Sequence, residues 1–136
     1  MKFKYKRFGQ FLRPVIPIKL KYKDRSIGYE VLVDSGADLC IFDAEIGDFL
    51  GIDIKNGRPD TVGGIAGQTA TYFIHPLEIE VGGWPYKIEA GFLPRVSGGF
   101  NYGVVGQKDF FDRFVVKFDL LKEEIELKER RQSEQS

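Results

Sequence analysis

The sequence predicts a single, mainly β domain that folds as a closed or partly closed barrel with one or two short helices. Three observations support this fold class. Short runs rich in β-branched and aromatic residues recur along the chain, 16 glycines and 6 prolines divide it into short segments, and little of it has helical character. A length of 136 residues is about one domain's worth and is enough to form an independent core. Short strands joined by tight turns are typical of barrels.

The first half of the chain contains two predicted strands. Residues 15–22 and 27–33 are rich in β-branched and aromatic side chains, and the polar residues 23–26 between them indicate a hairpin turn. Before them, residues 1–13 alternate basic and aromatic side chains. We expect this N-terminal arm to form a pairing edge strand or a flexible segment.

A short helix is predicted to follow, with Asp43 as its N-cap, Leu50 as its last residue and Gly51 placed to end it. A second short helix is predicted over residues 107–113. Because these two segments are the only helical candidates, the β class is favoured over a mixed one.

The second half contains two predicted hairpins. In residues 73–81 the apolar side chains of the second half alternate with glutamates, and a Gly-Gly pair then supplies a two-residue turn into a strand over residues 86–93. Residues 114–118 and 125–127 indicate another hairpin near the C-terminus. The polar residues 129–136 that follow are expected to form a frayed tail.

Composition excludes several functions. Lysine plus arginine total 20 and aspartate plus glutamate total 20, so no basic excess supports binding to nucleic acid, although the basic arm alone allows it. A single cysteine, Cys40, excludes an internal disulfide and a cysteine-rich metal site. A single histidine, His75, argues against a classical His-based zinc site and a Ser-His-Asp triad. No apolar run reaches the roughly 20 residues of a membrane span. We therefore expect a cytoplasmic protein without metal, cofactor, nucleic acid or membrane.

One segment combines a strand with residues capable of chemistry. The apolar strand within residues 30–39 stops at Asp34, which is followed by Ser35, Gly36 and Ala37. The strand carries the Asp34 carboxylate to the end of a sheet, and Gly36 lets the backbone turn or approach another chain closely. The same residues fit a simpler interpretation, in which Asp34 only caps a turn after a strand. Taken alone, they favour the turn.

Two further segments change that balance. Residues 61–68 form a glycine-dense hairpin tip, which suits either a mobile lid with Ile65 at its apex or an ordinary loop. Residues 102–111 place two apolar residues and a glycine, 104–106, directly before the second predicted helix. A core strand followed by a helix start is the simpler interpretation of this last segment.

In chain order, these three segments resemble the retroviral-type aspartic proteases (retropepsins) and their single-domain cellular and prokaryotic relatives. Residues 34–37 match the family's Asp-Ser/Thr-Gly-Ala signature after an apolar strand, and Asp38 follows. Residues 63–67 are similar to its glycine-rich flap tip, with Ala66 in one glycine position. Residues 104–106 match its third element, two apolar residues and a glycine before a short helix. The resemblance spans about residues 15–128.

The resemblance implies an aspartic endopeptidase that cleaves an extended polypeptide without metal or cofactor, acting as a two-fold homodimer in which each subunit supplies Asp34. It implies a flap hairpin and a protease domain over residues 14–128. Active-site loop support is expected from Ser35, Gly36 and Ala37. Substrate binding is expected from Asp38, Gly63, Gly64, Ile65, Ala66, Gly67, Val105 and Gly106.

The sequence also departs from the family pattern. Retroviral members usually carry an arginine after the third motif's glycine, where this chain has Gln107 and then Lys108. Asp38 is therefore expected to pair with Lys108 or with nothing. The family's chain ends build the subunit interface, and the longer arm here allows a different one. A dimeric peptide-binding or scaffold domain that cleaves poorly or not at all remains the alternative function.

Other candidate residues have structural interpretations. His75 is expected to be packed or at a strand edge, Cys40 to be a core residue, and Trp84 to be a packing anchor. Asp109 and Asp112 are expected to cap a helix or to lie on the surface.

Overall fold

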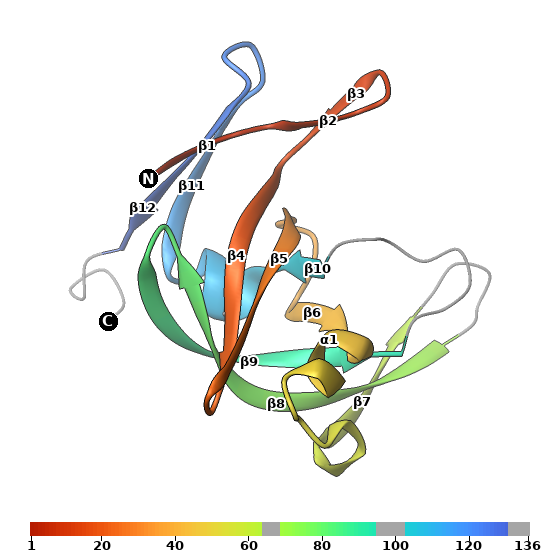
Figure 1. Ribbon diagram of the computed structural model, residues 1–136. Coiled ribbons are helices and arrows are strands. Elements are labelled where there is room, and N and C mark those ends of the chain that lie inside the picture. The colour runs from red at the N-terminus through yellow and green to blue at the C-terminus, as the bar shows by residue number, and fades with distance from the viewer. Residues whose placement is uncertain (64–68, 95–102, 131–136) are drawn as a thin grey trace.

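The computed structural model describes residues 1–63, 69–94 and 103–130, and its centre is a closed β-barrel (Figure 1). The strands pair in the order β4-β5-β10-β6-β9-β8, and β8 pairs back with β4 to close the ring. The predicted mainly β barrel is therefore confirmed. Strand β7 adds to the outer edge of β8. The bounds of these strands are β4 Val15–Tyr22, β5 Arg25–Val33, β6 Cys40–Asp43, β7 Arg58–Gly63, β8 Thr69–Val81, β9 Trp84–Leu93 and β10 Gly103–Val105.

Two further strand groups project from one end of the barrel (Figure 1). One is a three-stranded sheet in the order β1-β12-β11, and the other is a hairpin of β2 and β3. The N-terminal arm thus forms strands, and its first strand pairs with the last one of the chain. The bounds are β1 Lys2–Lys4, β2 Lys6–Phe8, β3 Phe11–Arg13, β11 Phe114–Asp119 and β12 Glu124–Glu129.

The core fills the barrel and continues under the three-stranded sheet. Aromatic rings meet edge to face at its centre, with the centroids of Phe42 and Phe92 5.9 Å apart. The largest completely buried side chains come from strands on every side and from the segment between β10 and β11, and they include Ile16, Leu20, Val31, Phe42, Ile79, Phe92, Phe110, Phe114, Ile125 and Leu127. Burial of this apolar surface is the main force that holds the barrel together.

Two predicted turns can be compared with the structure. The Gly82-Gly83 turn is confirmed, because Val81 pairs with Trp84 and both glycines have positive φ. The turn predicted over residues 23–26 is wrong in length, since Tyr22 pairs with Arg25 and only two residues form the turn. Lys23 takes the positive φ that this tight turn requires, at 54°.

The first predicted helix is confirmed. Helix α1 spans Ala44–Phe49, and the Asp43 side chain accepts a hydrogen bond from the Glu45 N–H at its N-terminus. Leu50 is the C-cap, and Gly51 follows with a φ of +84°. None of the described helices is long and apolar enough to cross a bilayer.

The prediction of a second helix over residues 107–113 is wrong, because this segment is not a regular helix. Residues Gln107–Phe111 (η3) form a single irregular turn, in which Lys108 is extended and Asp109 has a φ of +72°. The Phe111 N–H reaches back to the Gly106 carbonyl at 3.1 Å, a wider loop than an α-helical turn. Asp109 bonds to β9, so contact with the neighbouring strand overrides the local helical preference.

Strands β8 and β9 are longer than predicted. Strand β8 begins at Thr69, and β9 begins at Trp84, directly after the turn. The prediction that Trp84 is a packing anchor is wrong, because its side chain is 65% exposed. Cys40 and His75 are buried as predicted, and the His75 Nε2 atom lies 2.7 Å from the Ile54 carbonyl oxygen.

Candidate active site

The Asp34 carboxylate lies where β5 ends, next to β10. The Asp34 N–H donates to the Val105 carbonyl at 3.0 Å, and the Val33 N–H donates to the Pro14 carbonyl at 2.8 Å. Strand β5 runs parallel to β10 over this stretch, with Val33 opposite Val105. The backbone before Asp34 is therefore held by hydrogen bonds from both sides. These bonds fix the point from which the half-buried Asp34 side chain extends.

The loop after Asp34 is a tight turn built on its own side chain. Asp34 Oδ1 accepts a hydrogen bond from the Gly36 N–H at 2.9 Å, and the Asp34 carbonyl accepts one from the Ala37 N–H at 3.2 Å. A Cβ atom on Gly36 would lie 3.2 Å from that Oδ1 atom, so glycine keeps this contact relaxed. One carboxylate oxygen is thus anchored, while no residue in the described ranges bonds to Oδ2. The turn interpretation and the catalytic interpretation of these residues are compatible.

Gly106 allows the backbone of the third motif, residues 104–106, to lie directly against this loop. A Cβ atom at position 106 would lie 2.5 Å from the carbonyl oxygens of both Ala37 and Leu39, which no ordinary side chain tolerates. The approach allows the Gln107 N–H to donate to Ala37 O at 2.8 Å and the Lys108 N–H to donate to Asp38 O at 3.0 Å. Close backbone contact, rather than a positive φ, therefore explains this glycine.

Gln107 occupies the position where the family usually has arginine, and its side chain also holds the loop. Its Nε2 atom donates to the Ser35 carbonyl at 2.9 Å. Sequence reasoning noted Gln107 only as a departure and missed this contact, because the two residues are 72 positions apart in sequence. The chain thus places a neutral donor, rather than a positive charge, against the Asp34 loop.

The first of the two expected arrangements, a pair between Lys108 and Asp38, does not form. The Lys108 Nζ atom instead lies 2.9 Å from Glu89 Oε1 on β9. The hydrogen bond from Lys108, with its positive charge, lowers the pKa of Glu89, and the same bond raises the pKa of Lys108. Both side chains are partly exposed, so solvent screens most of this attraction. Among the described residues, none forms an ion pair with Asp38.

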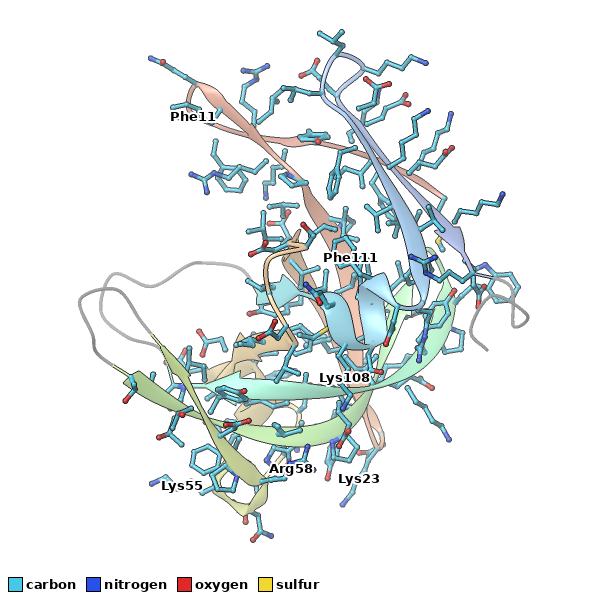
Figure 2. The ribbon with its side chains drawn as sticks, turned by 180° about the vertical axis from the view of Figure 1, so that it is seen from behind. Phe11, Lys23, Lys55, Arg58, Lys108 and Phe111 are labelled. Carbon is cyan, nitrogen blue, oxygen red and sulfur yellow. The ribbon has the colours of Figure 1, made fainter. Side chains whose placement is uncertain are left out.

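A polar pocket of about 270 Å³ opens beside Asp38. Three carboxylates and two cations reach it, and Figure 2 shows the cations Arg58 and Lys108 on the same part of the surface. Burial raises the pKa of Tyr72 on its wall, and the charge of Asp60 raises it further. The lining residues are Asp38, Leu39, Arg58, Asp60, Tyr72, Ile74, Glu89 and Lys108. Sequence reasoning connected only Asp38 and Lys108 among them, because most of the others come from the separate strands β7, β8 and β9.

A larger cavity, of about 650 Å³, lies elsewhere. It is lined by the tip of the β4–β5 hairpin and by β8 and β9, with Arg25 and Ser26 among its residues. These two residues begin β5, whereas Asp34 follows its end. The larger cavity is therefore not part of the candidate site, and the smaller pocket is the one adjoining the Asp34 loop.

The expected flap lies only partly in the described chain. Strands β7 and β8 pair as a long hairpin that ends at Gly63 opposite Thr69. Gly64, Ile65, Ala66 and Gly67 lie outside the described residues, and so does the side-chain environment at position 63.

Val105 and Val104 face opposite sides of β10. Val105 is completely buried in the core of this chain, whereas Val104 is only half-buried. The expectation that Val105 reaches a substrate pocket does not fit this burial, and Val104 is the residue of β10 with access to the surface.

The remaining nucleophiles and acids belong to the framework. Burial raises the pKa of the Cys40 thiol to about 12, which keeps it protonated at neutral pH. Asp109 accepts a hydrogen bond from the Glu89 N–H at 2.8 Å, so it braces β9 rather than capping a helix. Among the described residues, no cluster of three metal-ligating side chains is present.

Comparison with solved structures identifies the fold. The chain is similar to a retropepsin-like aspartic protease from Rickettsia conorii, with 16% identity over 93% of this chain and 89% of that one and a TM-score of 0.68. It is also similar to EIAV protease in complex with the inhibitor HBY-793, with 20% identity over 75% of this chain and 88% of that one and a TM-score of 0.53. No family model and no curated protein matches the sequence. The chain therefore has the retropepsin-like fold, which the motifs of its sequence predict.

Proposed function

We propose that this protein is an aspartic endopeptidase in which the Asp34 carboxylates of two subunits activate a water molecule. The position of Asp34 is the observation that carries the proposal. Its carboxylate follows a buried strand, one of its oxygens is anchored by the Gly36 N–H, and the loop is braced by the backbone after Gly106. A plain surface turn would not need two carbonyls within 2.5 Å of a glycine Cβ position.

The chemistry requires a second carboxylate. Two carboxylates held close together do not both ionise, so they share one proton. The ionised member takes a proton from water, whose oxygen adds to the peptide carbonyl, while the protonated member donates its proton to the carbonyl oxygen. Collapse of the resulting diol breaks the C–N bond as the amine takes up a proton. The chain holds one Asp-Ser-Gly motif, so the pair forms only in a two-fold dimer.

The surroundings of Asp34 suit an extended polypeptide. The β7–β8 hairpin extends as far as Gly63 and Thr69, and we propose that its tip covers the substrate as a flap. The pocket beside Asp38 receives a substrate side chain, and its three carboxylates and two cations favour a polar or charged one. Val104 replaces Val105 as the proposed apolar contact from β10, because only Val104 is partly exposed.

The test is cleavage of a diverse peptide library by the wild-type protein and by Asp34→Asn, from acid to neutral pH. Both proteins are first compared by circular dichroism and sedimentation. We expect cleavage by the wild type and loss of all of it in Asp34→Asn, because the amide cannot act as the base. Equal cleavage by both proteins would show that Asp34 is not the catalytic group.

Gln107 supports a second candidate function, a peptide-binding domain with little or no activity. The family's arginine is absent at this position, and no described cation pairs with Asp38. Peptides that bind to both proteins without being cleaved would favour this function. Binding and cleavage of the same peptides, measured together on the wild type, therefore separate the two candidates.

A further inference from the structure

The larger cavity, of about 650 Å³, lies far from the candidate active site. It adjoins the tip of the β4–β5 hairpin, and Figure 2 shows Lys23 of this tip at the end of the molecule opposite to Phe11. Asp34 follows the other end of β5, whose nine residues span about 30 Å. The volume is within the range of about 300–1,000 Å³ that is usual for small-ligand sites. This cavity therefore has room for a ligand of its own.

The cavity opens where β4 separates from β8. The register between these two strands ends with Lys21 opposite Glu78. Beyond that pair the β4–β5 hairpin continues to its turn at residues 23–24, whereas β8 stays paired with β9. Pro76, two positions before Glu78, has no N–H with which to extend a ladder. The fork between the hairpin tip and β8 thus leaves a gap in the barrel wall.

The inner wall of the cavity is apolar. Leu77 on β8 lies opposite Ile88 on β9, and both side chains belong to the core and line the cavity. The Tyr22 ring adds to this wall, and the Lys23 Nζ atom lies 5.4 Å from its centre. The cavity therefore offers apolar surface to the uncharged part of a ligand.

The mouth of the cavity carries an excess of positive charge. Four cations and two carboxylates line it, although the formal net charge of the whole chain is zero. Within the described ranges, none of these six side chains forms an ion pair. The six residues are Lys21, Lys23, Asp24, Arg25, Glu78 and Lys87. The excess of two positive charges is therefore available to an anion.

The neighbouring positions on the same strands show the difference. Lys19 and Glu80, two residues along β4 and β8 from Lys21 and Glu78, form an ion pair at 3.8 Å and do not line the cavity. Side chains alternate between the two faces of a strand, so both pairs lie on the same face. The pairing of charges thus stops where the cavity begins.

Two lysines flank the mouth of the cavity. The register places Lys21, Glu78 and Lys87 side by side on β4, β8 and β9. Lys21 and Lys87 are therefore two strands apart, or about 10 Å between their backbones. A lysine side chain is long and flexible, so both ammonium groups can approach one anionic group that lies between them.

Arg25 adds a donor with a defined position. Its Nη1 atom donates to the Phe49 carbonyl at 2.9 Å, which ties the guanidinium group to the end of α1. A guanidinium group has five N–H donors, so this bond leaves others for a ligand. Arg25 therefore needs less ordering than the lysines when it binds an anion.

We propose that this cavity binds a small organic anion. Lys21, Arg25 and Lys87 hold its carboxylate or phosphate group, and its apolar part lies against Tyr22 and Leu77. Carboxylate and phosphate share the charge and the acceptor oxygens that these cations recognise. The inference goes beyond the proposed function, because neither Asp34 nor cleavage takes part in it.

The experiment is a titration of the isotope-labelled full chain, followed by the NMR shifts of its backbone amides. The probes are octanoate, octyl phosphate, octan-1-ol and acetate. We expect octanoate or octyl phosphate to shift the signals of residues 21–26 and 76–88, and the tighter of the two identifies the anionic group. Octan-1-ol lacks the charge and should bind about three- to tenfold more weakly. Acetate lacks the apolar part and should also bind more weakly than octanoate.

A pair of double variants tests the two lysines. In Lys21→Gln/Lys87→Gln we expect binding of the better anion to weaken about three- to tenfold, and binding of octan-1-ol to stay the same. Lys19→Gln/Lys117→Gln is the matched control, because it removes the same charge from positions outside the cavity. Thermal unfolding checks that both variants fold. Asp34→Asn should bind the anion as the wild type does.

Several results would overturn the inference. Equal binding of the octyl anions and octan-1-ol would show that charge is not recognised, and equal weakening in both double variants would assign the effect to net charge alone. Shifts confined to other residues, loss of binding in Asp34→Asn or no binding of either octyl anion would remove the site. Each result is independent of cleavage, so a failure of the proposed function would leave this inference standing.

Discussion

The barrel and the two projecting hairpins are built from the same strand-forming residues but bury them to different degrees. In the barrel, Ile16, Leu20 and Phe92 are completely buried, because the ring closes on itself and its inward-facing apolar side chains pack against one another. In the hairpins, Phe11 and Leu121 remain exposed. A closed sheet buries the apolar side chains of its inner face against one another, whereas an open sheet that extends past the core leaves some of its apolar side chains exposed. The comparison predicts that the buried side chains of the barrel contribute much more to stability than the exposed side chains of the hairpins.

Truncation of a barrel side chain should have the largest effect. Phe92→Ala removes a completely buried ring that packs edge to face against Phe42 and His75, both with centroids 5.9 Å away. We expect a loss of about 3–5 kcal/mol in the free energy of unfolding, measured with urea. Leu121→Ala is the matched control and should change it by no more than about 0.5 kcal/mol. Similar losses in both variants would contradict the comparison.

Gly106→Ala should have the next largest effect. The added methyl group would lie 2.5 Å from two backbone carbonyls, so β10 and the Asp34 loop must move apart. We expect stability to fall by about 1–3 kcal/mol. We also expect any peptidase activity to be lost. Gly28→Ala, also in the barrel, has no atom within 4 Å of the new methyl group and should not destabilise the protein. Equal stability of the two variants would show that the contact at Gly106 is not tight.

Gln107→Glu should affect cleavage or peptide binding more than it affects stability. Glutamate keeps the length of the side chain but cannot donate to the Ser35 carbonyl, and a bond at an exposed position contributes about 0.5–1.5 kcal/mol. We expect a loss toward the lower end of that range by urea unfolding, with a clear decrease in cleavage or in peptide binding. Gln107→Arg restores a donor, so recovery of function in that variant would identify donation to the loop as the role of residue 107.

Glu89→Gln should have the smallest effect. The Glu89–Lys108 pair is partly exposed, so its removal should cost no more than about 0.5 kcal/mol at neutral pH. Because Lys108 lowers the pKa of Glu89 in the folded state, the contribution is present above the unfolded pKa and is lost as pH falls through the folded one. Unfolding curves of wild type and variant should therefore converge in acid. A difference that grows in acid would have the wrong sign for this pair.

The local parts of the fold could be predicted from sequence. The strand predicted over residues 15–22 is β4 with the same bounds, and the Gly82-Gly83 turn and the Asp43 cap are also as expected. Each depends on neighbours a few positions apart, which periodicity and turn chemistry capture. The predicted helix over residues 107–113 failed because Asp109 bonds to the backbone of β9, 20 positions away.

The sequence by itself determined the order of the strands along the chain, the Asp34-Ser35-Gly36 motif and the absence of a second copy of it. These features depend on residue type and spacing, which are local properties. The tertiary structure alone decided that Gln107 bonds to Ser35, that Lys108 pairs with Glu89 rather than Asp38, and that the hairpins leave their apolar residues exposed. Those contacts join residues from separate strands, and only closure of the barrel fixes which of them meet.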